Sequence, residues 1–419
     1  MDWRTVVSKY TQTAAFAANL WAQRAGTQYL AHVKHEPLAM LHTRKGRDDP
    51  YAIYRLMREN GPLSLSPRGS WFTASHRVCN AALRDRRLGV EQDEQLNLSF
   101  LGMNPPDHTR LRRLAQPAFS PKALPAFRDR IEKTVGGLLG KAAATAATEG
   151  HFDLVSAFAA PLPISVITDL LGIPDADSKE FGEHGAVVGS ALDGIQSLRH
   201  ASRFIAANAK LRTLFENLFE LRRREPADDL ISRLIAAEGD QVRPQELAPM
   251  VFLLLIAGFE TTVNVIGNCV LALMTNPEQW EALRAEPERL APKAVEEALR
   301  YDPPVQNTGR IALEDLELEG RQVQKGQWVL TMIGGAGRDP EVYERPDVFD
   351  IDRENPAEHL AFSGGIHYCV GQPLARMELA IAVQLLAERM PELKLAGPPR
   401  RRPTSTIRGL RHLPLSVGK

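Results

Sequence analysis

The feature that most restricts the fold is a long irregular segment, residues 333–369, which ends at a cysteine. It is rich in proline and glycine, shows neither helical nor strand periodicity, and extends for more than thirty residues before the helix predicted over 372–389. Loops of that length are unusual inside a compact domain and commonly carry function. A chain of 419 residues buries roughly 75% of its unfolded surface. The core is therefore large enough to hold this loop and to enclose a sizeable ligand.

Helical periodicity dominates the first two thirds of the chain, with apolar residues three and four positions apart. The predicted helices cover 122–146, 160–171, 196–223 and 244–275. A further helix is predicted with Pro292 just inside its start and Tyr301 near its end, where Asp302-Pro303-Pro304 stops it. Helices are therefore expected to form most of the fold.

Strand-like patterns are short. They cover 63–66 and 71–74, and they return over 309–332, where Gly320 and Gly326 mark turns. The predicted fold class is therefore mainly α with small β-sheets. Because no repeat or low-complexity linker marks a boundary, we expect a leader segment over residues 1–49 and a single domain over 50–419.

The charge balance argues against some partners. With 51 basic and 51 acidic residues, the chain lacks the cationic excess that nucleic-acid binding needs. The basic runs Arg222–Arg224 and Arg400–Arg402 are predicted to be solvated surface. The longest uncharged apolar run, between Glu246 and Glu260, is too short to span a membrane and predicts a buried helix.

The three cysteines are Cys79, Cys269 and Cys369, and no two have the spacing of a metal site. This pattern argues against a disulfide framework or a cysteine-rich cluster and fits a reducing compartment. The first residues carry no secretory signal. We therefore expect a cytoplasmic protein with no membrane span.

Cys369 lies in the sequence Phe362-Ser-Gly-Gly-Ile-His-Tyr-Cys-Val-Gly371, just before the predicted helix. Glycines on both sides let the backbone turn tightly and approach a flat ligand. A thiol near a helix N-terminus is expected to have a lowered pKa and to be available as a ligand. Phe362 could shield the sulfur from water, and His367 could reach a carboxylate of the ligand. The alternative is a buried structural cysteine after a glycine-rich turn.

Phe at Cys−7, Gly at Cys−4, His at Cys−2 and Gly at Cys+2 occur together, and this combination resembles the haem loop of the cytochrome P-450 family. The resemblance extends from about residue 50 to the C-terminus. It implies a triangular α-rich prism with haem b between the oxygen-binding helix and the cysteine-loop helix. It also implies that Cys369 is the iron ligand, since thiolate donation favours O–O cleavage.

The uncharged helix continues as Ala257-Gly258-Phe259-Glu260-Thr261, which resembles the family's oxygen-binding helix. The small pair Ala257-Gly258 would let backbone approach the haem face, and Phe259 would limit the pocket's height. Glu260 and Thr261 would relay protons to reduced dioxygen. The alternative is a buried helix whose threonine hydroxyl bonds back to a carbonyl one turn earlier.

Two further groups of residues match the family. Glu297 and Arg300 resemble its Glu-x-x-Arg pair, and Arg353 fits the loop arginine that this pair holds, in a structural role. The haem propionates need cationic partners. The resemblance assigns that role to His108, Arg112, Arg310 and His367, whereas surface salt bridges or solvated side chains are the alternative.

The resemblance implies a monooxygenase that inserts one oxygen atom from O2 into a small hydrophobic substrate. Electrons would come from a ferredoxin and its reductase, steered by a cationic face of Arg110, Arg112, Arg113 and Arg376. Alternatives are a peroxide-using or redox-neutral haem-thiolate enzyme, or a haem- or ligand-binding protein without turnover. By family analogy, the substrate pocket would be formed by 96–103, 189–197, 252–259, Val305, Gln306 and 405–407.

Overall fold

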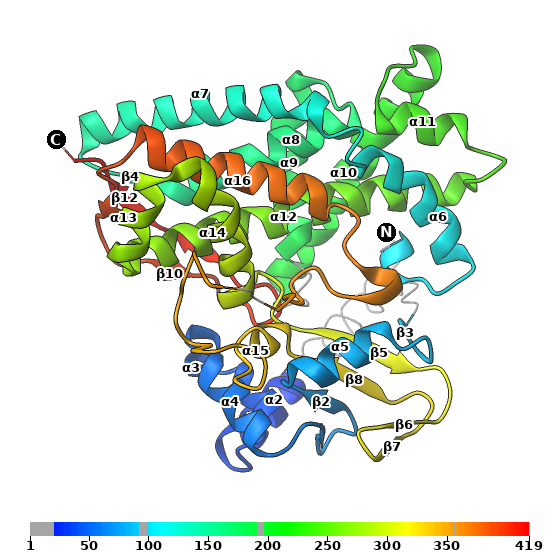
Figure 1. The fold of residues 1–419 in the computed structure, drawn as a ribbon. Helices are drawn as coiled ribbons and strands as arrows, with labels where there is room; N and C mark the ends of the chain where they lie inside the picture. Colours follow the sequence, from blue (N-terminus) through cyan, green and yellow to red (C-terminus); the bar gives the residue numbers. More distant parts are fainter. Residues whose placement is uncertain (1–20, 92–98, 191–196, 355–356, 419) are drawn as a thin grey trace, which may run out of the picture.

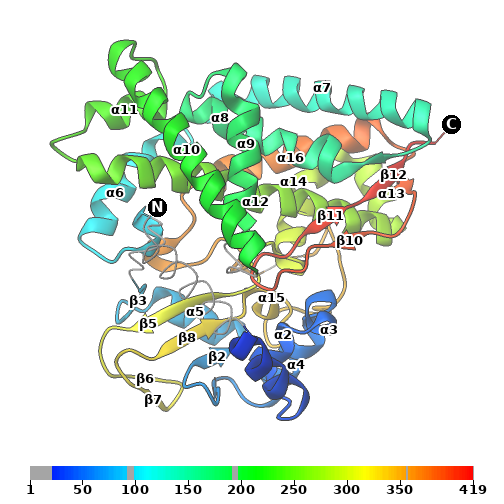
Figure 2. The same cartoon turned by 180° about the vertical axis from the view of Figure 1, so that it is seen from behind.

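The computed structural model describes residues 21–91, 99–190, 197–354 and 357–418. A large helical body lies beside a smaller part that contains the main sheet and the first helices (Figure 1). Turned by 180°, the molecule shows the C-terminal strands running beside α12 (Pro244–Thr275) (Figure 2). The fold is therefore helix-rich with small sheets, as the periodicity predicts.

The helices are of two kinds. The longer ones are α4 Tyr51–Glu59, α5 His76–Arg84, α6 Asp107–Ala115, α7 Pro125–Glu149, α8 Pro161–Leu171, α9 Asp175–Gly189, α10 Leu198–Arg224, α11 Leu230–Ala236, α12 Pro244–Thr275, α13 Pro277–Ala285, α14 Pro287–Tyr301 and α16 Gln372–Arg389. The short helical turns are α2 Pro37–Leu41, α3 Arg44–Asp48, η1 Ser99–Gly102, η2 Gln116–Phe119, η3 Val155–Ala159, α15 Ile333–Ala336 and η5 Gly365–His367.

The strands are β1 Ser64–Leu65, β2 Trp71–Thr73, β3 Leu88–Gly89, β4 Phe152–Asp153, β5 Thr308–Ala312, β6 Leu316–Leu318, β7 Arg321–Val323, β8 Trp328–Thr331, β9 Lys394–Leu395, β10 Arg400–Arg401, β11 Leu410–His412 and β12 Pro414–Ser416. The main sheet has the order β1-β2-β8-β5-β3, with β2 and β8 parallel and the other pairs antiparallel. Gly320 and Gly326 adopt positive φ at the predicted turns.

Local sequence signals explain where several helices begin and end. Proline occupies the first position of α7 and α8, where a missing N–H costs no hydrogen bond. Gly150 and Gly172 end these two helices in the left-handed conformation. The start of α12 is fixed by a capping box in which the backbone N–H of Arg243 donates to Glu246 at 2.9 Å.

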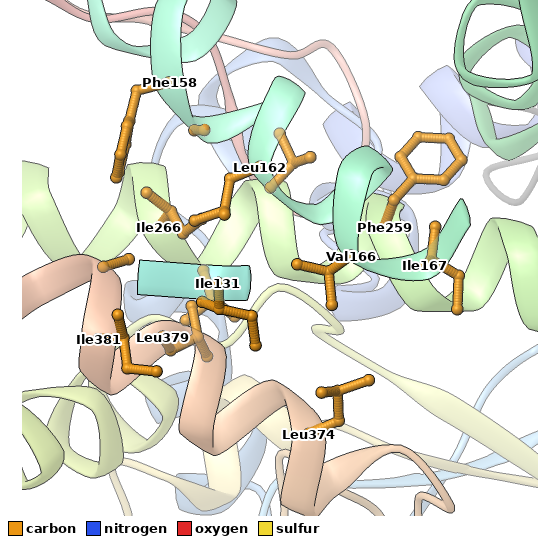
Figure 3. Close-up of a cluster of buried hydrophobic side chains, with 14 of the residues drawn as sticks. Ile131, Phe158, Leu162, Val166, Ile167, Phe259, Ile266, Leu374, Leu379 and Ile381 are labelled. Carbon is orange, nitrogen blue, oxygen red and sulfur yellow. The ribbon is translucent and has the colours of Figure 1, made fainter. Parts of the chain in front are cut away.

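The core is centred on α12, which contacts α8, α14 and α16. Ile266 from α12, Leu162 and Val166 from α8, and Leu379 and Ile381 from α16 belong to one buried cluster (Figure 3). By length and composition α12 could cross a membrane, but 78% of its most apolar window is buried inside the protein. It is the central core helix, which the uncharged run predicts.

Helix α14 corrects one prediction. It begins at Pro287, five residues before Pro292, which lies inside the helix. Pro287 supplies the proline-first start, and Pro292, in the second turn of the helix, removes one backbone hydrogen bond. Counting from the last proline therefore placed the helix start too late.

The end of the predicted leader is folded against the rest of the chain. Arg408, in the turn before β11, donates to the carbonyls of Arg47 at 2.6 Å and Asp48 at 3.1 Å. Residues 37–48 thus form α2 and α3 and contact the body of the protein. The domain boundary between residues 49 and 50 stays a prediction.

The basic runs are solvated only in part: Arg223, Arg224 and Arg400 are exposed as predicted, whereas one arginine of each run is paired with a buried acid. Arg222 donates to Asp229 at 2.6 Å, and the Arg222 side chain is only 16% exposed. Arg402 pairs with Glu260, a carboxylate in the middle of α12. Charge runs indicate a surface only when no buried acid faces them, and the sequence does not show which acid that will be.

Candidate functional site

The cysteine loop is closed by its own backbone. The N–H of Cys369 donates to the carbonyl of Phe362 at 2.9 Å. Inside this turn, Ser363 and Gly365 adopt φ values of +65° and +64°. A Cβ on Gly365 would lie 2.4 Å from the carbonyl oxygen of Leu83, so only glycine fits there. Cys369 is thereby held three residues before the start of α16.

The pKa of Cys369 corrects a prediction. Burial raises the pKa of the thiol, and this effect outweighs the lowering by the amides of Gly371 and Gln372 and by Arg112 and Arg376. The helix N-terminus acts in the predicted direction but is too weak alone. The thiolate form needs a stronger positive charge, which a bound metal ion would supply.

Gly371 differs from Gly365. Its φ is −85°, and a Cβ there would make only an ordinary contact with Phe119 at 3.6 Å. Neither backbone conformation nor protein packing therefore requires glycine at this position.

Four side chains that could carry positive charge gather beside this loop. Arg310 from β5 donates to Ser363 Oγ at 3.3 Å, and Arg112 from α6 donates to the Tyr368 carbonyl. The rings of His108 and His367 lie 4.5 Å apart. Both ring nitrogens of His108, and Nε2 of His367, are buried without a hydrogen-bond partner. In the described parts of the chain, none of the four forms an ion pair with a carboxylate.

Burial lowers the pKa of all four of these groups, Arg112 included. It lowers the pKa of Arg310 to about 10. Burial, followed by the charges of Arg310, His108 and Arg112, lowers the pKa of His367 to about 3. The pKa of His108 is lowered by burial and by Arg112. A dianionic ligand would relieve this positive potential, so the donor set fits a group that carries two carboxylates.

The middle of α12 has one open face. Ala257 is exposed although its neighbours Ile256 and Phe259 are buried. Thr261, one turn later, is partly exposed, and its hydroxyl donates to the Ala257 carbonyl at 3.0 Å. This is the back-bonded arrangement of the alternative interpretation, on a face that is open to a ligand.

Gly258 and Phe259 face the core, which corrects two predictions. A Cβ on Gly258 would lie 2.7 Å from Ile167 Cδ1, so this glycine lets α12 approach α8. Phe259 is 2% exposed, and its ring lies against Gly185 of α9. Figure 3 shows Phe259 near Ile167 in this cluster. Neither residue shares the open face of Ala257.

Glu260 is 1% exposed and forms an ion pair with Arg402. That Arg402 is the partner of Glu260 was not predicted from the sequence. A buried carboxylate in an apolar helix requires a cationic partner, which is the signal that the sequence offers. The sequence does not say that the partner comes from the segment after β10, more than a hundred residues away.

The Glu297–Arg300–Arg353 group is confirmed. Arg300 donates twice to Glu297 at 2.7 Å, and Arg353 donates to the same carboxylate at 3.2 and 3.3 Å. Arg300 also donates to the carbonyls of Gly337, Pro346 and Val348. The group thus fixes the long irregular loop to α14.

The predicted cationic face is smaller than expected. Arg110 is paired with Glu246 at 2.7 Å and with Asp107 at 2.6 Å. Arg376 is paired with Glu296 at 2.7 Å. Of the four arginines, only Arg113 is exposed. Carboxylates from neighbouring elements therefore neutralise part of the charge that the sequence suggests.

The predicted substrate-lining segments are described in part. Residues 92–98 and 191–196 lie outside the described residues. Gln306 is 1% exposed; it donates to the Pro303 carbonyl at 2.7 Å and accepts from Tyr54 at 3.0 Å. It is therefore a buried structural residue rather than a pocket wall. Val305 pairs with Ile407 in an isolated β-bridge.

The chain resembles known proteins over most of its length. The family model Cytochrome P450 matches residues 79–390. Cytochrome P450 107B1 of Saccharopolyspora erythraea is 40% identical over 407 residues, 95% of this chain and 96% of that protein. Cytochrome P450 monooxygenase PikC of Streptomyces venezuelae is 37% identical over 388 residues, 88% of this chain and 91% of that protein.

The crystal structure of P450BioI in complex with an acyl carrier protein ligated to hexadec-9Z-enoic acid matches with a TM-score of 0.83 and 34% identity, over 89% of this chain and 99% of that one. Together these matches confirm the predicted family and fold class. The chain belongs to the cytochrome P450 family, whose members are oxidoreductases that bind haem b through a cysteine thiolate.

Proposed function

We propose that this protein is a haem-thiolate monooxygenase that inserts one atom of O2 into a small hydrophobic substrate. The observation that carries the proposal is the unpaired set of Arg112, Arg310, His108 and His367 beside the loop of Cys369. Arg310 is buried and Arg112 partly buried, and their charges destabilise the protein unless a ligand supplies the anions. Haem b carries two such carboxylates.

Each residue has a proposed role in holding the cofactor. Cys369 is the iron ligand, and Phe362, whose carbonyl anchors it, covers the sulfur. The four residues of the unpaired set hold the propionates. Gly371 and Ala257 leave room for a flat ring, on the loop and on α12 respectively. The bound haem supplies thiolate-assisted O–O cleavage.

We assign proton delivery to Glu260 and Thr261. Thr261 presents its hydroxyl on the open face of α12, where Oγ1 can pass on a proton. Glu260 is held by Arg402, so it donates or accepts a proton only when that ion pair opens. Arg402 is thus proposed to control the availability of the acid.

The electron donors are proposed to be a ferredoxin and its reductase, and the compartment to be the cytoplasm. The exposed Arg113 is the group best placed to meet an acidic partner. Charge reversal in Arg113→Glu should slow the reduction of the protein by the ferredoxin and weaken its dependence on salt. Unchanged rates and salt dependence would remove Arg113 from the docking face.

The substrate class is proposed from the open side of α12 at Ala257 and from the mostly apolar segments predicted to line the pocket. A hydrophobic terpenoid, steroid, fatty acid, aromatic compound or polyketide would fit. The acyl chain carried in the P450BioI complex is one member of this set. A ligand panel monitored by the ferric spin state ranks these classes directly.

Replacing Cys369 with histidine tests the central assignment. The wild-type protein, reduced and bound to carbon monoxide, should give the red-shifted absorption band of a thiolate-ligated haem, and Cys369→His should lose this band. If the band persists in this variant, another residue is the ligand. Cys269→Ser, in a buried site on α12, is the matched control and should keep the band.

Thr261→Ala tests turnover against simple ligand binding. The variant should keep consuming reductant with a surrogate ferredoxin while releasing hydrogen peroxide instead of oxidised product. Thr262→Ala is the control, because its hydroxyl bonds the Gly258 carbonyl on the buried side. Wild-type protein that consumes no reductant with any ligand would favour a binding protein over an enzyme.

A further inference from the structure

A second charged group lies on the outer side of the cysteine loop and has no role in the proposed haem contacts. Glu296 from α14 accepts from Arg376 of α16 through two hydrogen bonds, at 2.7 and 3.0 Å. His359, from the irregular loop, meets the same carboxylate at 3.2 Å. Helices α14 and α16 lie side by side (Figures 1 and 2), so this group joins both helices to the loop.

The group encloses Phe362. The guanidinium carbon of Arg376 lies 4.5 Å from the centre of the Phe362 ring, within cation–π range. The His359 ring lies 5.7 Å from the same ring. Phe362 in turn accepts the hydrogen bond of the Cys369 amide at 2.9 Å. Glu296 is therefore connected to the cysteine loop through Arg376 and His359, which both contact the ring of Phe362.

The histidine is oriented by two contacts. Its Nδ1 accepts from the backbone N–H of Ala361 at 3.3 Å, which leaves Nε2 to donate to Glu296. Burial acts to raise the pKa of Glu296, but the hydrogen bonds from His359 and Arg376 outweigh it and bring that pKa to about 2. At neutral pH the carboxylate is therefore charged and compensates the guanidinium.

Stability alone does not account for this arrangement. The side chains of Glu296 and Arg376 are 40% and 33% exposed, and ion pairs at such positions contribute little to folding. What the geometry fixes is where a positive charge lies: over the ring of Phe362, the residue proposed to cover the cysteine. A charge held there acts on the sulfur whether or not it stabilises the fold.

We infer that Glu296 is a positioning residue that holds and partly neutralises Arg376 against Phe362, and so sets how readily the centre held by Cys369 accepts an electron. This inference rests on the proposed haem-thiolate function. It gives the half-exposed pair a role in redox tuning. Arg376 is thereby a tuning charge rather than a free contact for the electron donor.

The midpoint potential of the purified haem protein, measured by spectroelectrochemical titration at low ionic strength, tests the inference. In Glu296→Gln the charge of Arg376 is uncompensated, so the potential should shift positively. In Arg376→Gln the carboxylate is uncompensated, so it should shift negatively. Glu296→Asp keeps the charge and should restore most of the wild-type value. Shifts of the midpoint potential with opposite signs would support the inference, because loss of a purely structural contact would shift the potential of both variants in the same direction.

Asp229→Asn is the matched control. It neutralises one partner of another ion pair, Arg222–Asp229, which joins α10 to the start of α11 away from the cysteine loop. Its potential should equal that of the wild type even if its unfolding midpoint falls. If Glu296→Gln does not retain haem, the sign of the shift in Arg376→Gln decides.

Shifts of the same sign, or lower stability with unchanged potentials, would overturn the inference. Failure of the proposed function looks different: the wild-type protein itself would then lack the red-shifted carbonyl band. With that band present in the wild type, the potentials test Glu296 alone.

Discussion

Two groups of buried or partly buried arginines flank the long irregular loop, and they differ in how their charges are paired. On one side, Arg300 and Arg353 share the carboxylate of Glu297, with side chains between 2% and 9% exposed. On the other side, Arg112 and Arg310 have no carboxylate partner in the described chain and lie beside two histidines with unpaired ring nitrogens. The first group is complete within the protein, and the second is not.

This difference separates a structural role from a binding role. A buried charge costs several kcal/mol unless it is paired. Glu297 meets this cost for its two arginines, so that group is a clamp that is ready before any ligand binds. In the ligand-free protein, the charges of Arg112 and Arg310 stay without a carboxylate partner. Their burial therefore remains unfavourable until an anionic ligand binds. Residue type alone, arginine in both groups, does not make this distinction.

The largest effect should come from breaking the completed group. Glu297→Gln leaves Arg300 and Arg353 buried without a carboxylate, and we expect it to lower the free energy of unfolding by about 3–5 kcal/mol. Denaturant unfolding of the haem-free protein measures this loss. Glu286→Gln, which removes the carboxylate of the exposed pair with Arg289, is the control and should leave the midpoint unchanged. A loss no larger than that of the control would show that the clamp is not needed.

The unpaired group should respond in the opposite way. Arg310→Met removes a buried cation whose pKa burial lowers to about 10, so the haem-free protein should be at least as stable as the wild type. Haem affinity should fall by about 10- to 150-fold, because a charge-assisted hydrogen bond contributes roughly 1.5–3 kcal/mol. Haem titration and unfolding of the same samples give both numbers.

A paired arginine provides the contrast for that experiment. Arg408 is 7% exposed and donates to Asp302 at 2.7 Å. Arg408→Met should therefore destabilise the haem-free protein, since it leaves Asp302 short of a partner. If Arg310→Met destabilises the free protein as much as Arg408→Met does, the two groups are not different in kind.

The sequence predicts much of this comparison but not its most useful part. The spacing of apolar residues and the turn residues locate α12, α16 and the strands around Gly320 and Gly326, because these signals are local in the sequence. The family resemblance identifies Glu297 and Arg300, whose pairing is confirmed, and Arg310, whose contact with the cofactor stays a prediction. Pairing is not local, however. That Arg376 meets Glu296 and Arg402 meets Glu260 depends on helices and loops far apart in the chain.

The same limit explains the errors within motifs. Gly258 and Phe259 belong to the oxygen-helix motif, yet their directions follow from how α12 packs on α8 and α9. The pKa of Cys369 depends on burial, which a helix-terminus argument does not include. A motif states which residues are present near a site, and the packing decides which of them face it.

Lowering the pH should have a smaller effect, on the unfolding free energy of the haem-free protein, through the histidines of the unpaired group. The pKa of His108 is lowered from its ordinary 6.5 by burial and Arg112, so in the haem-free protein the unfolded chain binds a proton that the folded one does not. Stability should therefore fall as the pH drops below 6.5, by up to about 1.4 kcal/mol per pH unit from this group. His108→Gln should remove its own part of that slope in urea unfolding between pH 7 and 5; the slope that remains includes the contribution of His367, whose pKa is lowered to about 3.

Two controls make the pH test specific. His151→Gln removes an exposed imidazole at the end of α7 and should leave the slope as it is in the wild type. Haem binding should also reduce the slope, because propionates held beside His108, as proposed, would favour its protonated form. A slope that is equally steep with haem bound would place the propionates elsewhere.

The smallest effect on the free protein should come from Gly371→Ala, which tests the same distinction at the backbone. The added Cβ would meet only Phe119 at 3.6 Å, at a φ of −85° that any residue adopts. We expect the unfolding free energy of the haem-free protein to change by less than about 0.5 kcal/mol. Gly365→Ala, with its positive φ and a contact of 2.4 Å to Leu83, should cost about 1–3 kcal/mol in the same assay. If haem affinity nevertheless falls in Gly371→Ala, the ligand rather than the protein requires glycine there. An unchanged affinity would remove Gly371 from the cofactor contacts and leave the loop's glycines with a conformational role only.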